Sequence, residues 1–523
     1  MAQTINTNIA SLNAQRNLNT SQSALQTSLQ RLSSGLRINS AKDDAAGLAI
    51  SARFSSQIRG DTQAARNAND GISLAQTAEG GLSTAGDLLQ RIRELAVQSA
   101  NGTNSDSDRA SIQNEVGALS NELNRVANTT QFNGQNVLDG SLTAAQFQVG
   151  ANSGQTINIG IQSAKATDIG NNSLTAAFAA GGGGLSDAVA AAATAVTAHL
   201  NNNQLADTLN ITSGTGVTTN VSVSAGDSAK KIAATVNSLS SQSGVTASAT
   251  TTETISGLGL ADGSVQFTLR GDNSLESDAN STGVTISAKV KGGDLSAVAQ
   301  AINAQTGTTG VSASIKTNSS TGAKELQLSN SSGSDIEINN TNGAADDILK
   351  AATTTFRGTD QPAVGSTAAV TASTQAGLAQ GSAITVGGQL SFSSDSGFTI
   401  ASQNAQTTIV NGSTGSDLQS VAKVDVSTVD GANKALKTID SALNQINSNR
   451  AALGAIQNRF ASTISNLQTT TENLSASQSR IQDTDFAAET ANLTRGQILQ
   501  QAGTAILAQA NSLPNGVLSL LRG

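Results

Sequence analysis

Residues Ile439–Ile481 read IDSALNQINSNRAALGAIQNRFASTISNLQTTTENLSASQSRI and carry a regular apolar repeat. Steps of four and three residues from Ile439 reach thirteen positions, and nine of them are apolar. A seven-residue repeat held over six heptads, without a proline, predicts a long helix with one apolar stripe. Because an isolated helix gains most of its stability from packing that stripe, other helices must cover it.

The covering helices are expected in the first 130 residues, where the same spacing returns with little charge beside it. A small-residue stripe predicts a second long helix over residues 75–99, and a third helix is predicted over 112–126. Ser40 with Asp43, and Ser105 with Asp108, have the spacing of capping boxes that start helices. Short connections between these helices favour antiparallel neighbours, so we expect a bundle with residues 439–481. The stripe of the second helix consists of Ala75, Ala78, Leu82, Ala85, Leu89, Ile92, Ala96 and Ser99.

The two ends of the chain carry further amphipathic helices. The N-terminal helix is predicted from Ile5 to Leu36, and the C-terminal helix from Phe486 to a stop at Pro514. These two helices could pair, but two thin helices cannot hide all their apolar surface. We therefore expect other copies of the chain to cover the rest, where low charge limits the cost of desolvation. The candidate assembly residues are Ile5, Ile9, Leu12, Leu29, Leu32, Leu36, Leu493, Ile498, Leu507, Val517, Leu518, Leu520 and Leu521.

The middle of the chain, residues 176–420, changes period and is rich in Gly, Ser, Thr and Asn. Turn dipeptides such as Asn133-Gly134, followed by alternating apolar residues up to Ile161, predict a β-hairpin just before it. The run Gly181–Gly184 indicates a flexible joint. A repeat at sixty-six residues relates Ile232 and Gly244-Val245 to Val298 and Gly310-Val311, and each copy reads as a short helix followed by a strand.

Together these patterns predict an α+β multidomain protein, with a helical bundle built from both chain ends and a β-rich repeat insert at its tip. The predicted parts are 1–42, an inner helix; 43–175, a bundle with a hairpin; 176–420, variable domains with repeats at about 200–250 and 266–316; 421–481, the bundle's C-terminal helix; and 482–523, a second inner helix.

Composition excludes several functional classes. Cysteine is absent, aromatic residues make up 2% of the chain, and His199 is the only histidine. Thiolate catalysis, Cys-ligated metals and an H-E-x-x-H zinc site are therefore impossible, and a Ser-His-Asp triad would depend on one histidine. The net charge of −8 argues against nucleic-acid binding. No apolar run is long enough to span a membrane as a helix, and no Sec-type signal peptide is expected at the N-terminus. No catalytic site, metal or cofactor is predicted.

Several motifs resemble those of bacterial flagellin, over about the first 165 and the last 100 residues. They are Thr7–Asn13, Leu32–Asn39, Ala41–Leu48, Asn69–Ser73, Phe132–Gly134 and Val517–Leu521. The middle is similar to the hypervariable region of flagellins, and its repeat resembles a module found in some of them.

The resemblance implies a subunit of the flagellar filament, which is extracellular and is exported unfolded without a cleaved signal. Its terminal helices would order on polymerisation and form an inner tube, and the middle would lie on the filament surface. The implied partners are further copies of the chain, an export chaperone, the filament cap and hook-associated proteins. The polar positions of the 439–481 stripe are expected to meet polar groups or neighbouring subunits: Arg450, Gln457, Thr471 and Gln478.

The resemblance also implies recognition by host receptors. Leu88, Arg91 and Leu95 are expected on a flank beside the apolar stripe, and with Glu115 they match the pattern bound by the flagellin-sensing Toll-like receptor. Spacing alone fits ordinary packing between subunits equally well. The C-terminal leucines resemble those read by a cytosolic inflammasome receptor, although Gly523 departs from the common ending at Arg.

Two other functions remain open at this point. A hook-filament junction protein would resemble flagellin only at its termini, whereas the outer helical motifs are also present here. A trimeric adhesin or other coiled-coil surface protein would carry a signal peptide.

Overall fold

A computed structural model of the chain describes residues 7–176, 185–191, 201–278, 280–318, 321–359, 372, 374–404, 409–410 and 412–522, with side chains up to residue 512. Two compact units are present: unit 1 comprises Met1–Gly80, Thr130–Gln162 and Arg450–Gly523, and unit 2 comprises Gly81–Thr129 and Ser163–Asn449. Helical terminal regions and a β-rich middle confirm the predicted fold class, while the five-part division stays a prediction. Ile5, Gly181–Gly184 and His199 lie outside the described residues, as do the side chains of Val517, Leu518, Leu520 and Leu521.

Helix α1 (Ile9–Ser34) in unit 1 has a clear start and end. The Asn8 side chain accepts a hydrogen bond from the Ser11 N–H at 3.0 Å, which satisfies one of the free donors of the first turn. At the other end Gly35 has a φ of 72° and donates its N–H to the Arg31 carbonyl. Glycine takes up this left-handed conformation without steric cost, so the helix stops there.

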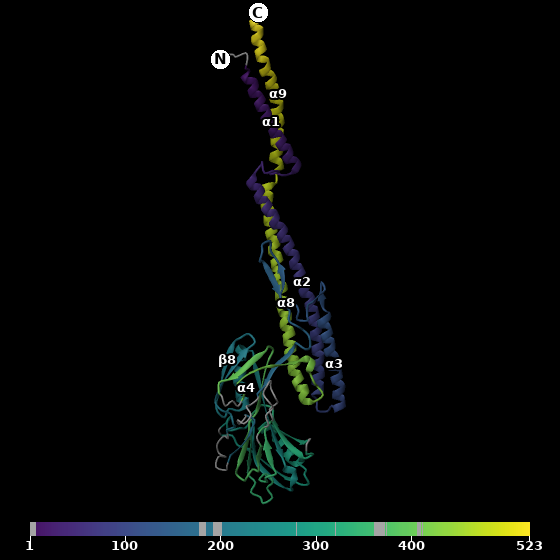
Figure 1. Ribbon diagram of the computed structural model, residues 1–523, viewed down its shortest axis with the longest axis vertical. Helices are drawn as coiled ribbons and strands as arrows, with labels where there is room; N and C mark the ends of the chain where they lie inside the picture. Colours follow the sequence, from purple (N-terminus) through teal and green to yellow (C-terminus); the bar gives the residue numbers. More distant parts are fainter. Residues whose placement is uncertain are drawn as a thin grey trace. The chain divides into compact units, whose positions relative to one another are not determined.

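Helix α9 (Phe486–Arg522) runs antiparallel to α1, as Figure 1 shows. The Asn8 amide donates to the Ala510 carbonyl at 2.8 Å near one end, and Arg31 lies 3.9 Å from Glu489 near the other. The predicted pairing of the terminal helices is thus confirmed. The predicted stop at Pro514 is wrong, because α9 continues to Arg522. A proline removes one N–H donor and can be accommodated inside a helix, with local bending, when the turns on both sides remain bonded.

Helix α2 (Ala45–Ser99) starts later than its predicted capping box. Ser40 and Asp43 do bond to each other, with the Ser40 N–H at 2.8 Å from the Asp43 carboxylate, but they close a turn before the helix. The cap is Asp44, whose carboxylate accepts from the Gly47 N–H at 2.8 Å. The position of the helix start was therefore wrong by one turn.

Unit 1 packs around Phe460, a fully buried residue of α8 (Val429–Gln482). A Cβ at Gly71 of α2 would lie 2.6 Å from the Phe460 ring, so only glycine leaves room for it. Phe147 meets the same ring edge to face, with centroids 5.7 Å apart. The predicted hairpin that carries Phe147 is confirmed, and a smaller one precedes it: β3 (Ala145–Gln148) with β4 (Thr156–Ile159), and β1 (Gln131–Phe132) with β2 (Gln135–Asn136).

Two of the polar positions in the α8 stripe meet polar groups, as expected. The Gln457 amide donates to the Glu79 carboxylate at 2.9 Å, and the Gln478 amide donates to the Ser51 carbonyl at 3.4 Å. For Arg450 and Thr471 the expectation stays a prediction.

The helical part of unit 2 combines the last third of α2, α3 (Asp106–Thr129) and the start of α8. The predicted stripe of α2 is buried without exception from Leu82 to Ser99. Ser105 and Asp108 form the predicted capping box at the start of α3. The Gln113 side chain donates to the Val424 carbonyl at 3.1 Å and accepts from the Val426 N–H at 2.7 Å, which ties the loop before α8 to the bundle.

The middle region consists of three sheets with short helices. The four-stranded sheet has the order β20 (Ser413–Gly415), β19 (Phe398–Ser402), β7 (Asp207–Ser213), β8 (Thr218–Val223). The five-stranded sheet has the order β11 (Val284–Val290), β10 (Gly263–Arg270), β14 (Ile336–Asn340), β17 (Ala383–Val386), β6 (Ala188–Ala191). The eight-stranded sheet has the order β12 (Val311–Thr317), β13 (Lys324–Asn330), β9 (Thr246–Ser256), β18 (Gln389–Ser394), β5 (Gly170–Thr175), β21 (Asp417–Ser420), with β15 (Thr355–Arg357) and β16 (Thr374–Ala376) beside β9. The short helices are α4 (Ala229–Ser238), α5 (Ser240–Ser243), α6 (Ser296–Asn303), α7 (Thr306–Thr309), and the 3₁₀ turns η2 (Leu258–Leu260) and η3 (Val421–Lys423).

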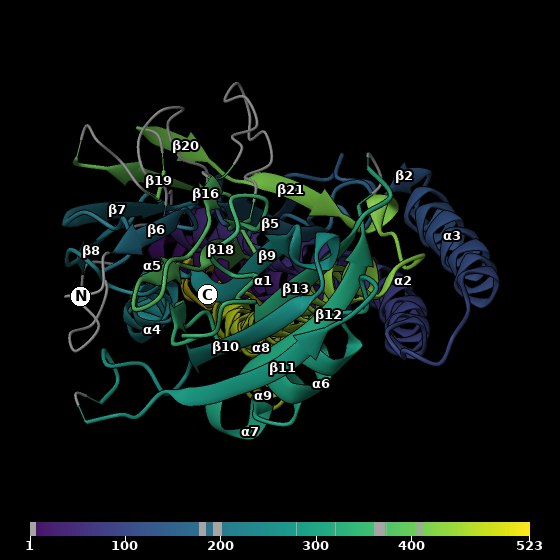
Figure 2. The same cartoon turned by 90° about the horizontal axis from the view of Figure 1, so that it is seen from below.

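The sixty-six-residue repeat is present as two copies of one unit: a hairpin, a helix and a strand. Module 1 is β7, β8, α4 and β9, and module 2 is β10, β11, α6 and β12, with α6 against β11 and β12 (Figure 2). In module 1 the Asn237 side chain bonds both the N–H and the carbonyl of Ala247, at 2.8 Å each. In module 2 Asn303 bonds Ala313 in the same way, at 2.7 and 2.9 Å. The predicted repeat of helix and strand is therefore confirmed.

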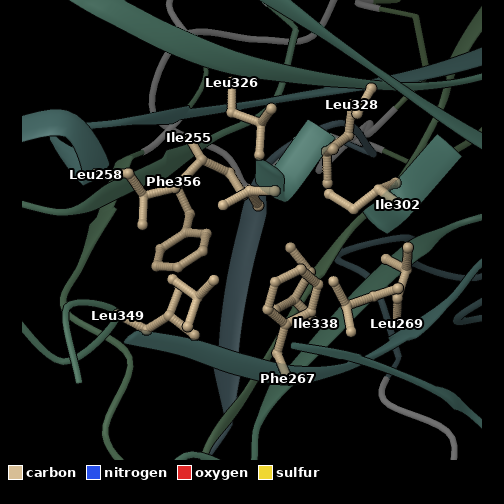
Figure 3. Close-up of a cluster of buried hydrophobic side chains, with 14 of the residues drawn as sticks. Ile255, Leu258, Phe267, Leu269, Ile302, Leu326, Leu328, Ile338, Leu349 and Phe356 are labelled. Carbon is tan, nitrogen blue, oxygen red and sulfur yellow. The ribbon is translucent and has the colours of Figure 1, made fainter. Parts of the chain in front are cut away.

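Each module has its own hydrophobic core. Core 1 surrounds α4, β7, β8 and the first half of β9, and includes Ala247 and Ala249. Core 2, drawn in Figure 3, includes Phe267 of β10, Phe356 of β15 and Ile255 at the far end of β9. Strand β9 therefore contributes to both cores.

Candidate assembly and receptor surfaces

In the contact between α1 and α9, small residues of α9 lie against leucine side chains of α1. Ala14 and Ser28 of α1 and Ala510 of α9 are buried. A Cβ added at Gly496 or Gly503 of α9 would lie 3.3 or 3.2 Å from a leucine side chain of α1. The two helices therefore approach closely where these glycines lie opposite leucines.

Several large apolar side chains of α1 and α9 point away from this contact and are exposed. Among the predicted assembly residues, Ile9 is 62% exposed, Ile498 is 60% exposed, and Leu12 and Leu29 are about half exposed. Apolar rows of this length are unusual on the surface of a soluble monomer. The remaining predicted residues of α1 and α9 with described side chains, together with Leu36 just past α1, are half-buried: Leu32, Leu36, Leu493 and Leu507.

Three exposed residues of α9 were missed by the sequence analysis: Phe486, Leu499 and Ile506. Their exposure depends on which stripe of α9 faces α1, and the small residues Gly496, Gly503 and Ala510 occupy that stripe. A seven-residue spacing of small residues in the sequence was the signal that could have located the contact.

A second candidate surface lies on α2 and α3 in unit 2. The Arg91 guanidinium donates to the Glu115 carboxylate at 2.9 and 3.2 Å and to Glu94 at 3.0 Å. The hydrogen bonds that Arg91 donates to Glu115, and then the one it donates to Glu94, raise the pKa of Arg91. The Arg91 and Glu115 side chains are 51% and 47% exposed, so the ion pair is presented to solvent.

The leucines of the predicted receptor pattern are less accessible than expected. Leu95 is 2% exposed and Leu88 is half-buried. Leu95 was predicted on a flank beside the apolar stripe, and it is buried there because the bundle of unit 2 covers that face of α2 in addition to the stripe. A second interhelical ion pair, which the sequence analysis missed, joins Arg93 to Asp440 of α8 at 2.6 Å.

Neither surface has the composition of a catalytic or metal site. In the part of the chain that the structure describes, no three His, Cys, Asp or Glu side chains gather where they could hold a metal ion. None of the described helices is long and apolar enough to cross a membrane.

Comparison with protein families gives matches at both ends of the chain. The bacterial flagellin N-terminal helical region matches residues 5–143, and the bacterial flagellin C-terminal helical region matches residues 436–521. This chain belongs to the bacterial flagellin family. The flagellin hook IN motif matches residues 208–264 and 266–332, which correspond closely to modules 1 and 2.

Curated flagellins align with this flagellin over its full length and theirs. The B-type flagellin of Pseudomonas aeruginosa is 43% identical, flagellin of Salmonella typhimurium is 38% identical, and flagellin D of Vibrio cholerae is 34% identical. The solved FliC structure from Burkholderia pseudomallei aligns with 74% of this chain and 99% of its own at 20% identity, with a TM-score of 0.29. That score is too low to carry an argument about geometry.

Family membership settles the general role of this flagellin. It is a structural component of the extracellular flagellar filament, which is a polymer, and it is not an enzyme. The exposed apolar faces of α1 and α9 are thus available for contacts between copies.

Proposed function

We propose that this flagellin builds the main filament shaft, and that neighbouring copies cover the outward apolar faces of α1 and α9. The supporting observation is that one face of α9 carries small residues that lie against α1, whereas the exposed Ile9 and Ile498 point away from the contact. Burial of apolar area contributes about 25 cal/mol per Å². Burying these rows between copies therefore stabilises the polymer relative to the monomer, in which they stay exposed. Contacts that are head to tail and do not close produce a helical filament.

The sharpest test is a polar substitution on the outward face of α9. Ile498→Asp should abolish seeded polymerisation, because it buries an unpaired carboxylate in the subunit contact. Ile498→Leu, which keeps the apolar area, is the matched control and should polymerise. Electron microscopy after seeding is the measurement. Normal filaments from Ile498→Asp would contradict the role of this face.

The same experiment separates the shaft from the alternative functions. The wild-type protein should extend seeds into long helical filaments. Persistent monomers or short oligomers would instead favour a hook-filament junction protein or a coiled-coil adhesin.

We also propose that the monomer is recognised by the flagellin-sensing Toll-like receptor through Arg91 and Glu115. The support is their exposure as one ion pair, in a pattern like that of other flagellins, above the buried Leu95 and the half-buried Leu88. In this proposal the leucines fix the position of α2 more than they contact the receptor.

Charge exchange tests this recognition without removing the ion pair. Arg91→Glu with Glu115→Arg keeps opposite charges across α2 and α3, and receptor activation by monomer should fall sharply. The matched control exchanges the charges of Arg93 and Asp440, which also form an interhelical ion pair. Arg93 projects from α2 about 200° around the helix axis from Arg91, so this control pair lies on another side of the helix. Unchanged activation by the Arg91/Glu115 exchange would reject the proposal.

The C-terminal leucines are proposed to act twice, in filament packing and in recognition by a cytosolic inflammasome receptor. The support is the family ending at Val517–Leu521, which is accessible only before assembly in such a scheme. Deleting residues 517–523 should abolish polymerisation, and filaments of the truncated chain would refute the assembly role. Export without a cleaved signal, and binding to an export chaperone, the cap and hook-associated proteins, are proposed from family membership.

A further inference from the structure

Strand β9 passes from one module's core into the other. Its buried face carries Ala247 and Ala249 in core 1 and Ile255 in core 2. Between them, on the same face, lie Thr251 and Glu253, both 0% exposed. Thr251 and Glu253 therefore form a polar step, a short polar segment of β9 between the two hydrophobic cores.

The polar atoms of this step have no partners. The Thr251 hydroxyl and both carboxylate oxygens of Glu253 are buried without a hydrogen bond in the structure. Space around Thr251 is tight, since a Cβ at Gly388 would lie 2.7 Å from its hydroxyl. Buried polar groups are rarely left unpaired, and each such group calls for an explanation.

The charges near β9 do not face Glu253. Its partner on β13 is Leu328, and Glu325 points to the opposite face of that strand. Lys324 shares the face of Leu326 and Leu328, but it is exposed at the far end of β13, four residues from Leu328. Arg357 of β15 is opposite Thr254, whose side chain leaves the other face of β9. Strands β17 and β18 contain no charged residue.

The remaining elements packed on β9 also direct their charges elsewhere. On β14, Ile336 and Ile338 enter core 2, so Glu337 points to the other side of the sheet, where it pairs with Arg270 at 3.5 Å. On α4, Lys230 and Lys231 are exposed and pair with Asp272 at 3.0 Å and Asp227 at 2.6 Å. Among the residues that the structure describes, no cation is therefore placed to compensate an ionised Glu253.

A second buried carboxyl, Asp335, lies where the modules meet. The Asn202 amide before β7 donates to one of its oxygens at 2.8 Å, and the other oxygen has no partner. Two further carboxylates, Glu276 and Glu337, lie close enough to disfavour its ionised form. Asp335 is thus a second acid at the junction that is more stable with its proton.

We propose that Glu253 is a proton-controlled joint between modules 1 and 2. With the proton bound, β9 completes both cores and the modules pack together. When Glu253 ionises, its carboxylate needs water or a cation that the closed junction does not provide, and β9 loosens from the surrounding strands. The middle region then opens in alkaline surroundings.

The direction of the pH effect follows from proton binding. Burial alone raises the pKa of Glu253 to about 8, from 4.5 for an ordinary glutamate. Burial is also the main cause that raises the pKa of Asp335. Between the unfolded and folded pKa values the closed state holds a proton that the open state has lost, so stability is full below about pH 4.5 and falls as pH rises toward 8.

Hydrogen exchange of the full-length monomer across pH 5–9, corrected for intrinsic rates, tests the proposal. Between about pH 5 and pH 8, protection of β9 and α4 should fall by about tenfold per pH unit for each buried acid involved, and the fall should level off above about pH 8. The glutamine of Glu253→Gln cannot ionise, so this variant loses the contribution of one acid to the slope. Its protection of β9 and α4 should therefore depend less steeply on pH than that of the wild type, by a factor of about ten per pH unit. The unpaired amide lowers protection equally at every pH, and therefore leaves the slope as the diagnostic quantity.

Asp417→Asn on β21 is the matched control, because Asp417 is an exposed acid of the same sheet, and it should keep the wild-type slope. Equal slopes for the wild type and Glu253→Gln would overturn the proposal. If Glu253→Gln fails to fold, carbon NMR of the wild-type glutamate carboxyls decides: one glutamate titrating well above pH 7 is expected, and titration of all of them near pH 4–5 rejects the joint.

Discussion

The helix pair α1–α9 and the middle region use apolar residues in opposite ways. In the middle region the largest side chains, such as Phe267 and Phe356, are about 1% exposed. In the helix pair small residues form the contact, and Ile498 and Ile506 are each 60% exposed. One region completes its core within a single chain, and the other leaves large apolar side chains exposed in the monomer.

This difference shows that the length of an apolar repeat does not reveal what covers it. Both ends of the chain carry amphipathic helices, yet in the described residues the helices near α3 and the hairpin β3–β4 are buried within the monomer, whereas α1 and α9 keep exposed apolar faces. The stability of each region in the monomer depends on how much of its apolar surface the chain itself buries, because the hydrophobic contribution depends on the area removed from water. Substitutions at apolar positions that are buried to different extents test this difference between the two regions.

The largest effect is expected in core 2 of the middle region. Phe267→Ala removes a fully buried ring from β10 and should destabilise the middle region by about 3–5 kcal/mol, through lost burial and the cavity left behind. Hydrogen exchange of β10 and β14 in the monomer measures this loss. A loss below about 1 kcal/mol would mean that core 2 is not the stabilising element of module 2.

A smaller effect is expected where a helix of unit 1 is tightly covered. Gly71→Ala places a methyl group 2.6 Å from the Phe460 ring, and the overpacking should cost about 1–3 kcal/mol despite the better helix propensity of alanine. The measurement is thermal unfolding of the monomer. Gly80→Ala, on the same helix with open space around it, should instead stabilise by about 0.5–1 kcal/mol. Equal effects of the two substitutions would show that Phe460 does not pack against α2 as described.

The repeated asparagine offers a comparison within the middle region. Asn303→Ala removes two hydrogen bonds to Ala313, and each lost bond should cost about 0.5–1.5 kcal/mol. Asn237→Ala removes the equivalent pair to Ala247, so the two variants should lose similar protection in α6 and α4. A loss in only one variant would indicate that one module is held by its core alone.

Periodicity predicted the parts of the fold that depend on one element at a time. The α2 stripe from Ala75 to Ser99 and the α8 stripe follow directly from residue spacing, because a helix repeats its faces without reference to its neighbours. The repeat of the middle region was equally visible, since the same residue types recur at a fixed distance. These predictions needed no knowledge of tertiary contacts.

The misplaced details all depend on packing between elements. The burial of Leu95 reflects the width of the contact that the bundle makes with α2, which spacing does not define. Ser40, with Asp43 three residues on, had the pattern of a helix cap, but Asp44, four residues after Ser40, took that role, because several polar residues competed near the same turn. The sharing of β9 between two cores, with Glu253 between them, arises from strand order alone and had no signal in the sequence.

The smallest effect on the monomer is expected on the outward face of α9, and it is the most informative for the comparison. Ile498→Ala removes a side chain that is already 60% exposed, so monomer stability should change by less than about 0.5 kcal/mol. The same substitution should raise the concentration needed for seeded polymerisation, since it removes apolar area from the proposed contact between copies. Hydrogen exchange of α9 and a polymerisation titration measure the two quantities on one sample. A large loss of monomer stability would place Ile498 in a covered core and remove the contrast between the two regions. An unchanged critical concentration would leave the outward face without the role in assembly that its exposure suggests.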